Sequence, residues 1–305
     1  MQLGHLLITG GSGFIGSHLT SLALEHSKSV TVIDLQPESN PFAHHLVGDI
    51  ADRNSLMSQV PRRIDTIFHL AARTSVLQSI NDPQGVFNTN VVGTQNLLEL
   101  ARDRGTGRIL LASTNAVVGN FVDGRITETS PLRPMTPYGS TKAAAEVLSN
   151  AYGASYGVAA TQLRLTNVYG EGMANKDSIV PRLMRTALGM SLFSVYGDGE
   201  QYRDYVYVKD VARAFVELAK TDYQGPVIIG SGISISVNTL VQKTSNATGI
   251  DIPFDRVDAK AGEMRGVRVD NSLARSLGIR FEVDIDLGLV RTWQDFNRDR
   301  NFPNP

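Results

Sequence analysis

A tyrosine and a lysine four residues apart offer acid–base chemistry in the stretch TPYGSTKAAAE, residues 136–146. Thr136 and Pro137 form an N-cap and first-turn pair, which predicts that a helix begins here. Tyr138 and Lys142 then lie one turn apart on the same face of that helix, where their side chains can interact. This spacing suggests a phenol that acts as a general base and an ammonium that activates it.

The ammonium has to make the phenol more acidic, because an unperturbed phenol has a pKa of about 10 and is a poor base at neutral pH. Lowering that pKa by about three units takes about 4 kcal/mol, and a cation about 4 Å away supplies about 4 kcal/mol at an effective dielectric constant near 20. The phenolate can then deprotonate a secondary alcohol while hydride leaves the same carbon for a nicotinamide. An exposed Tyr and Lys on a helix surface is the alternative.

A second Tyr-x-x-x-Lys match, Tyr205 to Lys209, lies in the sequence YVYVK. This segment alternates with a period of two, which predicts a strand. Residues i and i+4 of a strand are about 13 Å apart, so these two side chains cannot cooperate. Tyr138 and Lys142 therefore remain the catalytic candidates.

A strand that ends in hydroxyl groups is expected to complete the site. The segment RILLAST, residues 108–114, is typical of a buried strand and delivers Ser113 and Thr114 to the carboxyl edge of a parallel sheet, where ligands bind. Thr114 can share a hydrogen bond with a substrate hydroxyl and with Tyr138. An ST-turn or a helix cap is the structural alternative for Thr114.

A glycine-rich turn, TGGSGFIGSHL, follows the first apolar run and indicates a dinucleotide site. The spacing of Gly10, Gly13 and Gly16 allows a tight turn, backbone contact with a pyrophosphate and close packing of the next helix. Asp34 ends the second apolar run, where a carboxylate accepts both ribose hydroxyls and repels a 2′-phosphate, so NAD is favoured over NADP. Asp49 is expected at the adenine edge. A turn without a ligand and a surface aspartate are the alternatives.

Short apolar runs alternate with helical patterns through the first half of the chain. The runs are apolar on both faces, which predicts a parallel sheet covered on both sides, a doubly wound (Rossmann) α/β fold. The clearest helices are predicted at 84–104, with Gly105 as the stop, and at 137–156. The runs lie at residues 6–9, 30–34, 44–50, 66–72, 108–114 and 160–170.

The regular alternation weakens after about Gly170, which suggests two domains. We expect residues 1–170 to form an NAD-binding domain, to which 204–230 return. We expect 171–203 and 231–305 to form a smaller, discontinuous α/β lobe that binds the substrate.

The composition narrows the class of protein. The chain has 305 residues, is 42% hydrophobic and has a formal net charge of −1, which argues against nucleic acid as a partner. It has no Cys, hence no disulfide or thiolate zinc site, and no other metal-ligand spacing occurs. Because no run approaches eighteen apolar residues and no signal peptide is evident, we expect a soluble cytoplasmic protein without a membrane partner.

In their order along the chain, these motifs resemble the extended short-chain dehydrogenase/reductase family. More narrowly, they are similar to its NAD-dependent sugar-nucleotide epimerase/dehydratase branch, which includes UDP-hexose and UDP-hexuronate 4-epimerases. The resemblance covers nearly the whole chain and implies bound NAD, a nucleotide-diphosphate sugar under the smaller lobe, and a homodimer through the two clear helices. The motifs are TGGSGFIG, Asp34, HLAA, NTNVVGTQNLLE, Thr114, PYGSTK, LRLTNVYG, VYGDGEQYRDYVYVKDVA and GEMRGVRVD.

The resemblance also implies roles by position. On the substrate side, Asn167 and Arg203 would contact the diphosphate and Tyr196 would stack on the base. Glu263 would bind the ribose, whereas Lys260 occupies a usual Arg position and loses its bidentate geometry. The cofactor residues would be Gly10, Gly13, Phe14, Ile15, Gly16, Asp34, Asp49, Ile50, Leu70, Ala71, Ala72, Asn90, Tyr138 and Lys142.

Two departures from the family pattern bear on the reaction. Asn115 and Ala116 follow Thr114, where family dehydratases have Asp and Glu and decarboxylases keep a Glu. Eliminating water from a 4-keto sugar needs an acid and a base, and neither Asn nor Ala can serve. Epimerisation needs only Tyr138, Thr114 and NAD, so a 4-epimerase is favoured. Val118, at a usual Tyr position, is the second departure.

Other interpretations remain open. The enzyme alternatives are a dehydratase, a decarboxylase or a reductase acting on a related nucleotide sugar. A non-catalytic NAD-sensing module is an alternative of another class, although it would not need Thr114, Tyr138 and Lys142 together. Arg73 and Asn115 are candidate sugar contacts, with a plain loop as the alternative for Arg73. His69, in a buried strand, is expected to be a core histidine.

Overall fold

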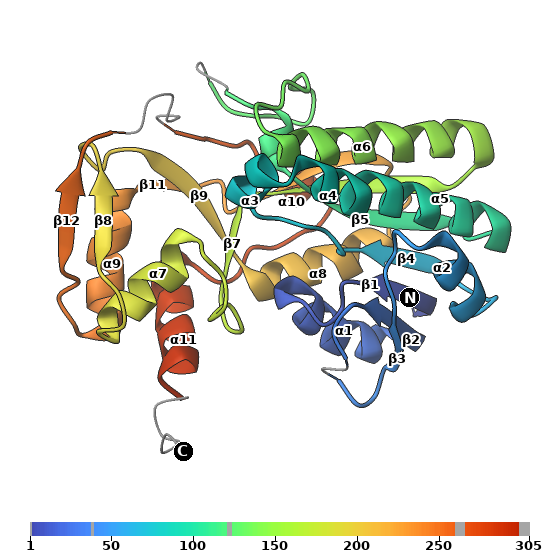
Figure 1. Cartoon of the computed structure of the whole chain (residues 1–305), viewed down its shortest axis with the longest axis horizontal. Coiled ribbons are helices and arrows are strands. Elements are labelled where there is room, and N and C mark those ends of the chain that lie inside the picture. The colour runs from blue at the N-terminus through green and yellow to red at the C-terminus, as the bar shows by residue number, and fades with distance from the viewer. Residues whose placement is uncertain (1, 38–39, 121–123, 260–265, 299–305) are drawn as a thin grey trace.

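One parallel sheet forms the centre of the protein in the computed structural model, which describes residues 2–37, 40–120, 124–259 and 266–298 (Figure 1). Its strands are β1 (Leu3–Thr9), β2 (Ser27–Asp34), β3 (His44–Val47), β4 (Thr66–His69), β5 (Arg108–Thr114), β6 (Ala159–Leu165) and β10 (Gly225–Ile229). They pair in the order β10-β6-β5-β4-β1-β2-β3. The direction of winding reverses between β1 and β4, so the predicted doubly wound Rossmann fold is confirmed.

Helices cover both faces of this sheet, as Figure 1 shows. One face carries α1 (Phe14–His26) and α8 (Val208–Ala219), and the other carries α2 (Arg53–Gln59), α5 (Gly93–Arg104) and α6 (Pro137–Tyr156). No helix in the described part of the chain is long and apolar enough to cross a membrane.

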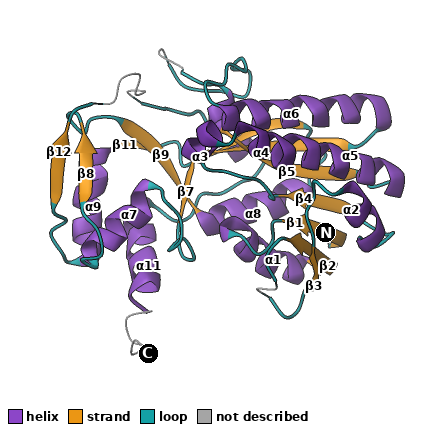
Figure 2. Cartoon of the chain, in the orientation of Figure 1, coloured by secondary structure: helices purple, strands orange, loops and turns teal. Residues whose placement is uncertain are grey.

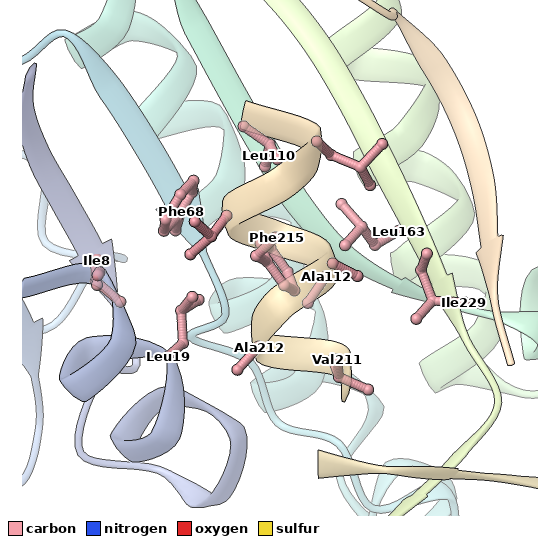
Figure 3. Packing of buried hydrophobic residues seen from close by; sticks show 14 of the residues in the cluster. Ile8, Leu19, Phe68, Leu110, Ala112, Leu163, Val211, Ala212, Phe215 and Ile229 are labelled. Carbon is pink, nitrogen blue, oxygen red and sulfur yellow. The ribbon is translucent and has the colours of Figure 1, made fainter. Parts of the chain in front are cut away.

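Burial on both faces explains why the strands are apolar throughout. In β1, Leu6 and Ile8 enter the core beneath α1 and α8, whereas Leu7 enters the opposite core beneath α5. Figure 3 shows the first core, in which Phe215 of α8 lies edge-on to Phe68 of β4 with 5.7 Å between ring centres.

Local signals set the helix boundaries. The side chain of Thr136 accepts a hydrogen bond from the backbone N–H of Gly139, and α6 ends where Gly157 adopts a φ of 73°. The predicted helix at 84–104 stops at Gly105 as expected, but three elements make it up. These are α4 (Pro83–Phe87), the π-helical turn η1 (Asn88–Val92) and α5.

A second lobe has its own hydrophobic core, which includes Tyr169, Met184, Tyr207, Leu240 and Leu289. Figure 2 shows its strands on the side of the molecule away from α2. One small sheet contains β7 (Asn167–Tyr169), β9 (Tyr202–Tyr207) and β11 (Ser234–Ser236), and the other contains β8 (Phe193–Tyr196) and β12 (Phe254–Val257). The lobe's helices are α7 (Ile179–Ala187), α9 (Val237–Thr248) and α11 (Ile285–Arg298). The other short helices among the described residues are α3 (Val76–Asn81), η2 (Asn115–Val117) and α10 (Ser272–Ser276).

Two expectations about this lobe were wrong. The predicted strand at 160–170 divides at Thr166 into β6 of the main sheet and β7 of the small sheet. Within 204–230, α8 and β10 return to the main sheet, but β9 pairs with β7 because Tyr205 and Tyr207 pack into the core of the second lobe. Apart from this change within 204–230, the domain boundaries given above stay a prediction.

Candidate active site

A cavity of about 680 Å³ lies at the carboxyl ends of β1, β4, β5 and β6, at the point where the winding of the sheet reverses. Ligands of doubly wound sheets bind at this position. The predicted site residues that line the cavity are Gly10, Gly13, Phe14, Ile15, Gly16, Asp34, Asp49, Ile50, Leu70, Ala71, Ala72, Arg73, Thr114, Tyr138, Lys142 and Asn167.

The glycine-rich turn fits a pyrophosphate. Gly10 has a φ of +72°, and a Cβ atom added to Gly16 would lie 2.0 Å from the carbonyl oxygen of Gly10. A Cβ atom on Gly13 would meet only that oxygen, at 3.2 Å, so this glycine leaves the cavity open at its wall. Gly13 is also the N-cap of α1 and no side chain caps this helix, so the positive end of the helix can face an anion.

Carboxylates mark the far end of the cavity. Asp34, at the end of β2, accepts hydrogen bonds from the backbone N–H groups of Ser12 and Gln36, each at 3.0 Å. Asp49 accepts one from Ala51 at 2.8 Å. Backbone donors thus hold the Asp34 carboxylate at the rim of the glycine-rich turn, where a ribose is expected.

Asn90 does not line the cavity, although it was expected to contact the cofactor. It is buried in η1, where its amide oxygen accepts from the N–H of Arg73 at 2.9 Å and its amide nitrogen donates to the carbonyl of Arg73 at 3.1 Å. The amide nitrogen also donates to Thr141 of α6. Asn90 therefore fixes the loop after β4, and a contact with the cofactor stays a prediction.

The three predicted catalytic residues meet in the cavity. Tyr138 and Lys142 are 9% and 3% exposed, and Thr114 makes a side-chain hydrogen bond to Tyr138. The Lys142 ammonium donates to the carbonyl of Ala112 at 2.9 Å. The hydroxyl of Thr114 also accepts from the N–H of Ala116 at 3.2 Å, so the cap proposed as its alternative exists beside the functional contact.

Burial changes the acidity of this pair in a direction that the sequence did not predict. It raises the pKa of the Tyr138 phenol to about 12, against a lowering by the hydrogen bond from Thr114. Burial also lowers the pKa of the Lys142 ammonium to about 8, against a rise caused by the Glu146 carboxylate. The net effect of the protein alone is therefore a less acidic phenol, and the Lys142 ammonium donates its hydrogen bond to the Ala112 carbonyl.

His69 is a core histidine, as expected. Burial, followed by the charge of Lys142, lowers its pKa to about 3, so the ring is neutral. Its two ring nitrogens lie 2.7 Å and 2.9 Å from the hydroxyls of Thr9 and Thr94. Its hydrogen-bonding capacity is used within the core.

On the substrate side, the predicted residue Asn167 lines the cavity and donates from its amide to the carbonyl of Asp204 at 2.9 Å. The described cavity wall also includes residues that sequence reasoning missed. Tyr205, set aside as part of the second Tyr-x-x-x-Lys match, lines the cavity from β9, whereas Lys209 lies in α8 rather than in a strand. Lys176, Ser178, Ile179 and Val180 line it as well. No motif marks these residues, because the second lobe brings them to the cavity.

Several predicted substrate residues are not part of this wall. Tyr196 and Arg203 lie outside the cavity lining, although Arg203 shares a face of β9 with the lining residue Tyr205. Asn115 does not line the cavity either, and both polar atoms of its buried amide lack a hydrogen-bond partner among the described residues. Lys260 and Glu263 lie outside the described residues.

Val118, the second departure from the family pattern, is 2% exposed. It packs with Val117, Ile126 and Ala143 in a small hydrophobic cluster. Val118 therefore packs in the interior and does not line the cavity.

Comparison with known proteins places this geometry in a family. A UDP-glucose 4-epimerase of Corynebacterium glutamicum is 31% identical over 281 residues, covering 85% of this chain and 84% of its own length. A dTDP-glucose 4,6-dehydratase of Streptomyces griseus is 31% identical over 319 residues, covering 99% and 96%. The crystal structure of UDP-glucose 4-epimerase from Thermotoga maritima, with UDP-glucose, has a TM-score of 0.92 and 30% identity, covering 97% of this chain and 100% of that one. Residues 6–230 match the model of the NAD dependent epimerase/dehydratase family, so the chain belongs to this family and its cofactor is NAD.

Proposed function

We propose that this enzyme catalyses the NAD-dependent 4-epimerisation of a nucleotide-diphosphate sugar, a UDP-hexose or a UDP-hexuronate. The distribution of acidic residues around the cavity carries the proposal. Among the described residues that line it, the only carboxylates are Asp34 and Asp49, which lie at its adenosine end. Thr114, Tyr138 and Lys142 supply a base and its partners, but no second acid stands beside them in the described lining to remove water from the sugar.

In the proposed reaction, Tyr138 removes the proton from the hydroxyl on carbon 4 of the sugar, and Thr114 holds that hydroxyl in line. Bound NAD supplies a reversible hydride acceptor and a positive charge on its nicotinamide ring. The charges of this ring and of Lys142 favour the phenolate form of Tyr138, which burial alone disfavours. After the 4-keto sugar has turned over, the hydride returns to the opposite face of carbon 4 and Tyr138 gives its proton back to the carbon-4 oxygen, which forms the alcohol of opposite configuration.

The glycine-rich turn and Asp34 would hold the NAD, and Asn167 would contact the diphosphate of the sugar nucleotide. Arg73 would contact the sugar, and two observations bear on this role: it lines the cavity, and its guanidinium donates a hydrogen bond to Asp82 at 2.5 Å. Contacts from Asn115, Tyr196, Arg203, Lys260 and Glu263 belong to the same proposal.

A dehydratase is the second candidate, because dehydratases of the family are as similar to the chain as epimerases are. The two are separated by incubating the purified protein with NAD and each of UDP-glucose, UDP-glucuronate and UDP-N-acetylglucosamine. We expect a 4-epimer, detected by chromatography and proton NMR, with no change in mass. A product that has lost water or carbon dioxide would contradict the proposal.

We also propose a homodimer. Large apolar side chains are exposed on neighbouring helices α3, α4 and α6, among them Leu77, Ile80, Phe87 and Val147. Such a patch on a protein surface favours association with another surface. Light scattering after size-exclusion chromatography is expected to give twice the mass of the chain, and Ile80→Glu is expected to reduce it to the mass of the monomer.

A further inference from the structure

A buried ionic network lies directly behind the catalytic pair. The carboxylate of Glu146 accepts a hydrogen bond from the hydroxyl of Ser113 at 2.5 Å and one from Nη2 of Arg164 at 2.8 Å. Nε of Arg164 also donates to this carboxylate at 3.1 Å. Glu146 and Arg164 are 2% and 3% exposed, so the pair is removed from solvent.

The network joins α6 and β5, which carry the catalytic residues, to the neighbouring strand β6. Glu146 lies on α6, one turn beyond Lys142. Ser113 and Arg164 are register partners on the neighbouring strands β5 and β6. Ser113 also stands between Ala112, whose carbonyl holds the Lys142 ammonium, and Thr114, which bonds to Tyr138.

Stability alone does not explain this arrangement. A buried ion pair gains little over well-packed apolar side chains of similar volume, whereas removing one partner leaves an uncompensated charge. Here two cations, Lys142 and Arg164, share the buried region with the carboxylate of Glu146. Its hydrogen bonds run to the strand that carries Thr114, which is the arrangement expected of a group that orients reacting side chains.

We propose that Glu146, braced by Arg164, is a positioning residue that holds the end of β5 against α6 and keeps the Lys142 ammonium charged beside Tyr138. This inference rests on the proposed function, since its kinetic effect is on that reaction. The other ionisable groups in this region are Tyr138 on the same helix, Arg164 on β6, which is paired with Glu146, and His69 on β4, which is neutral because its pKa is about 3. Glu146 is thus the anion that acts on Lys142.

The test compares Glu146→Gln and Ser113→Ala with the matched control Ser149→Ala in the NAD-loaded enzyme. Ser149 is also buried on α6, but its hydroxyl contacts Gln162 and the backbone of Glu146, outside the cavity lining. We expect Glu146→Gln to lower kcat by about 10- to 100-fold and Ser113→Ala by about tenfold, with little change in KM. The alkaline limit of the kcat profile is expected to move to lower pH in Glu146→Gln.

A second readout does not depend on turnover. The sequence has seven lysines, so NMR of protein labelled with ¹³C at the lysine ε-carbon, with the Lys142 signal assigned from Lys142→Met, can follow its titration. In Glu146→Gln, the Lys142 signal is expected to titrate at a lower pH than in the wild-type protein. In Ser149→Ala, it is expected to titrate at the same pH as in the wild-type protein. If no nucleotide sugar turns over, the proposed function fails while this titration still tests the network.

The proposal is overturned if both variants lower kcat no more than Ser149→Ala does and the Lys142 titration is unchanged. If Glu146→Gln does not fold, Ser113→Ala decides, because it keeps the ion pair and removes the hydrogen bond that links Glu146 to β5. An unaltered kcat in Ser113→Ala would then reject the positioning role.

Discussion

Replacing Lys142 with methionine is expected to stabilise the folded protein at neutral pH while abolishing turnover. Burial lowers the pKa of the Lys142 ammonium from its ordinary value of 10.5 to about 8. The unfolded chain therefore binds this proton more tightly than the folded protein does, and the free energy of unfolding rises with pH between about 8 and 10.5. Below pH 8, keeping the buried ammonium charged costs about 3 kcal/mol.

Methionine has a similar length and no charge, so Lys142→Met removes this cost. The replacement also removes the hydrogen bond that the Lys142 ammonium donates to the carbonyl of Ala112 at 2.9 Å. Losing this bond reduces the gain in stability by about 1 kcal/mol. We expect a net gain of about 2 kcal/mol in the free energy of unfolding at pH 7. The gain should shrink towards pH 10, where the lysine of the wild-type protein loses its proton.

The assay is denaturant unfolding of both proteins at pH 7 and pH 10, after removal of NAD, because a ligand that binds only the folded state adds stability. Lys28→Met is the control, since Lys28 is exposed on β2 and its replacement should change stability little. A Lys142→Met protein that is less stable than the wild type at pH 7 would refute the reasoning, as would a stability difference that is the same at both pH values.

Three further predictions concern the cofactor and the reaction. Tyr138→Phe is expected to lower kcat by about 10² to 10⁴-fold while NAD still binds, as measured by calorimetry and a coupled assay; unchanged turnover would contradict the role of Tyr138, and NAD binding without turnover in either protein would support the NAD-sensing alternative. Gly16→Ala is expected to weaken NAD binding at least tenfold, because its Cβ would lie 2.0 Å from the Gly10 carbonyl, whereas Gly107→Ala, which has no atom within 4 Å, is not. Asp34→Asn is expected to narrow the preference for NAD over NADP by about fivefold in binding constants, since about 1 kcal/mol of charge repulsion is removed.

The first half of the fold could be predicted well from the sequence, because its local signals agree with the tertiary structure. Thr136 and Gly157 bound α6 by their own backbone chemistry, so residue types and spacing alone were enough to place Tyr138 and Lys142 on a helix. The glycine-rich turn was equally local. Each depends on residues within one or two turns of chain.

The substrate side was less predictable because it depends on contacts between distant segments. Tyr205 lies on a strand as predicted, but only the pairing of β9 with β7 brings it to the cavity. Lys176, just before α7, and Ile179, the first residue of α7, line the same wall. Their residue types carry no signal for this, since an isolated lysine and an aliphatic side chain are common anywhere in a lobe.

The acidity of the catalytic pair was mispredicted for a related physical reason. The spacing of phenol and ammonium along the helix follows from the sequence but their burial does not, and burial disfavours the charged form of each. Burial raises the pKa of Tyr138, which favours the neutral phenol, and lowers the pKa of Lys142, which makes its ammonium easier to deprotonate. Since proton abstraction needs the phenolate and the ammonium together, the fold itself works against the active charge state. Other charges must favour it, and the carboxylate of Glu146 is the one that α6 itself places beside Lys142.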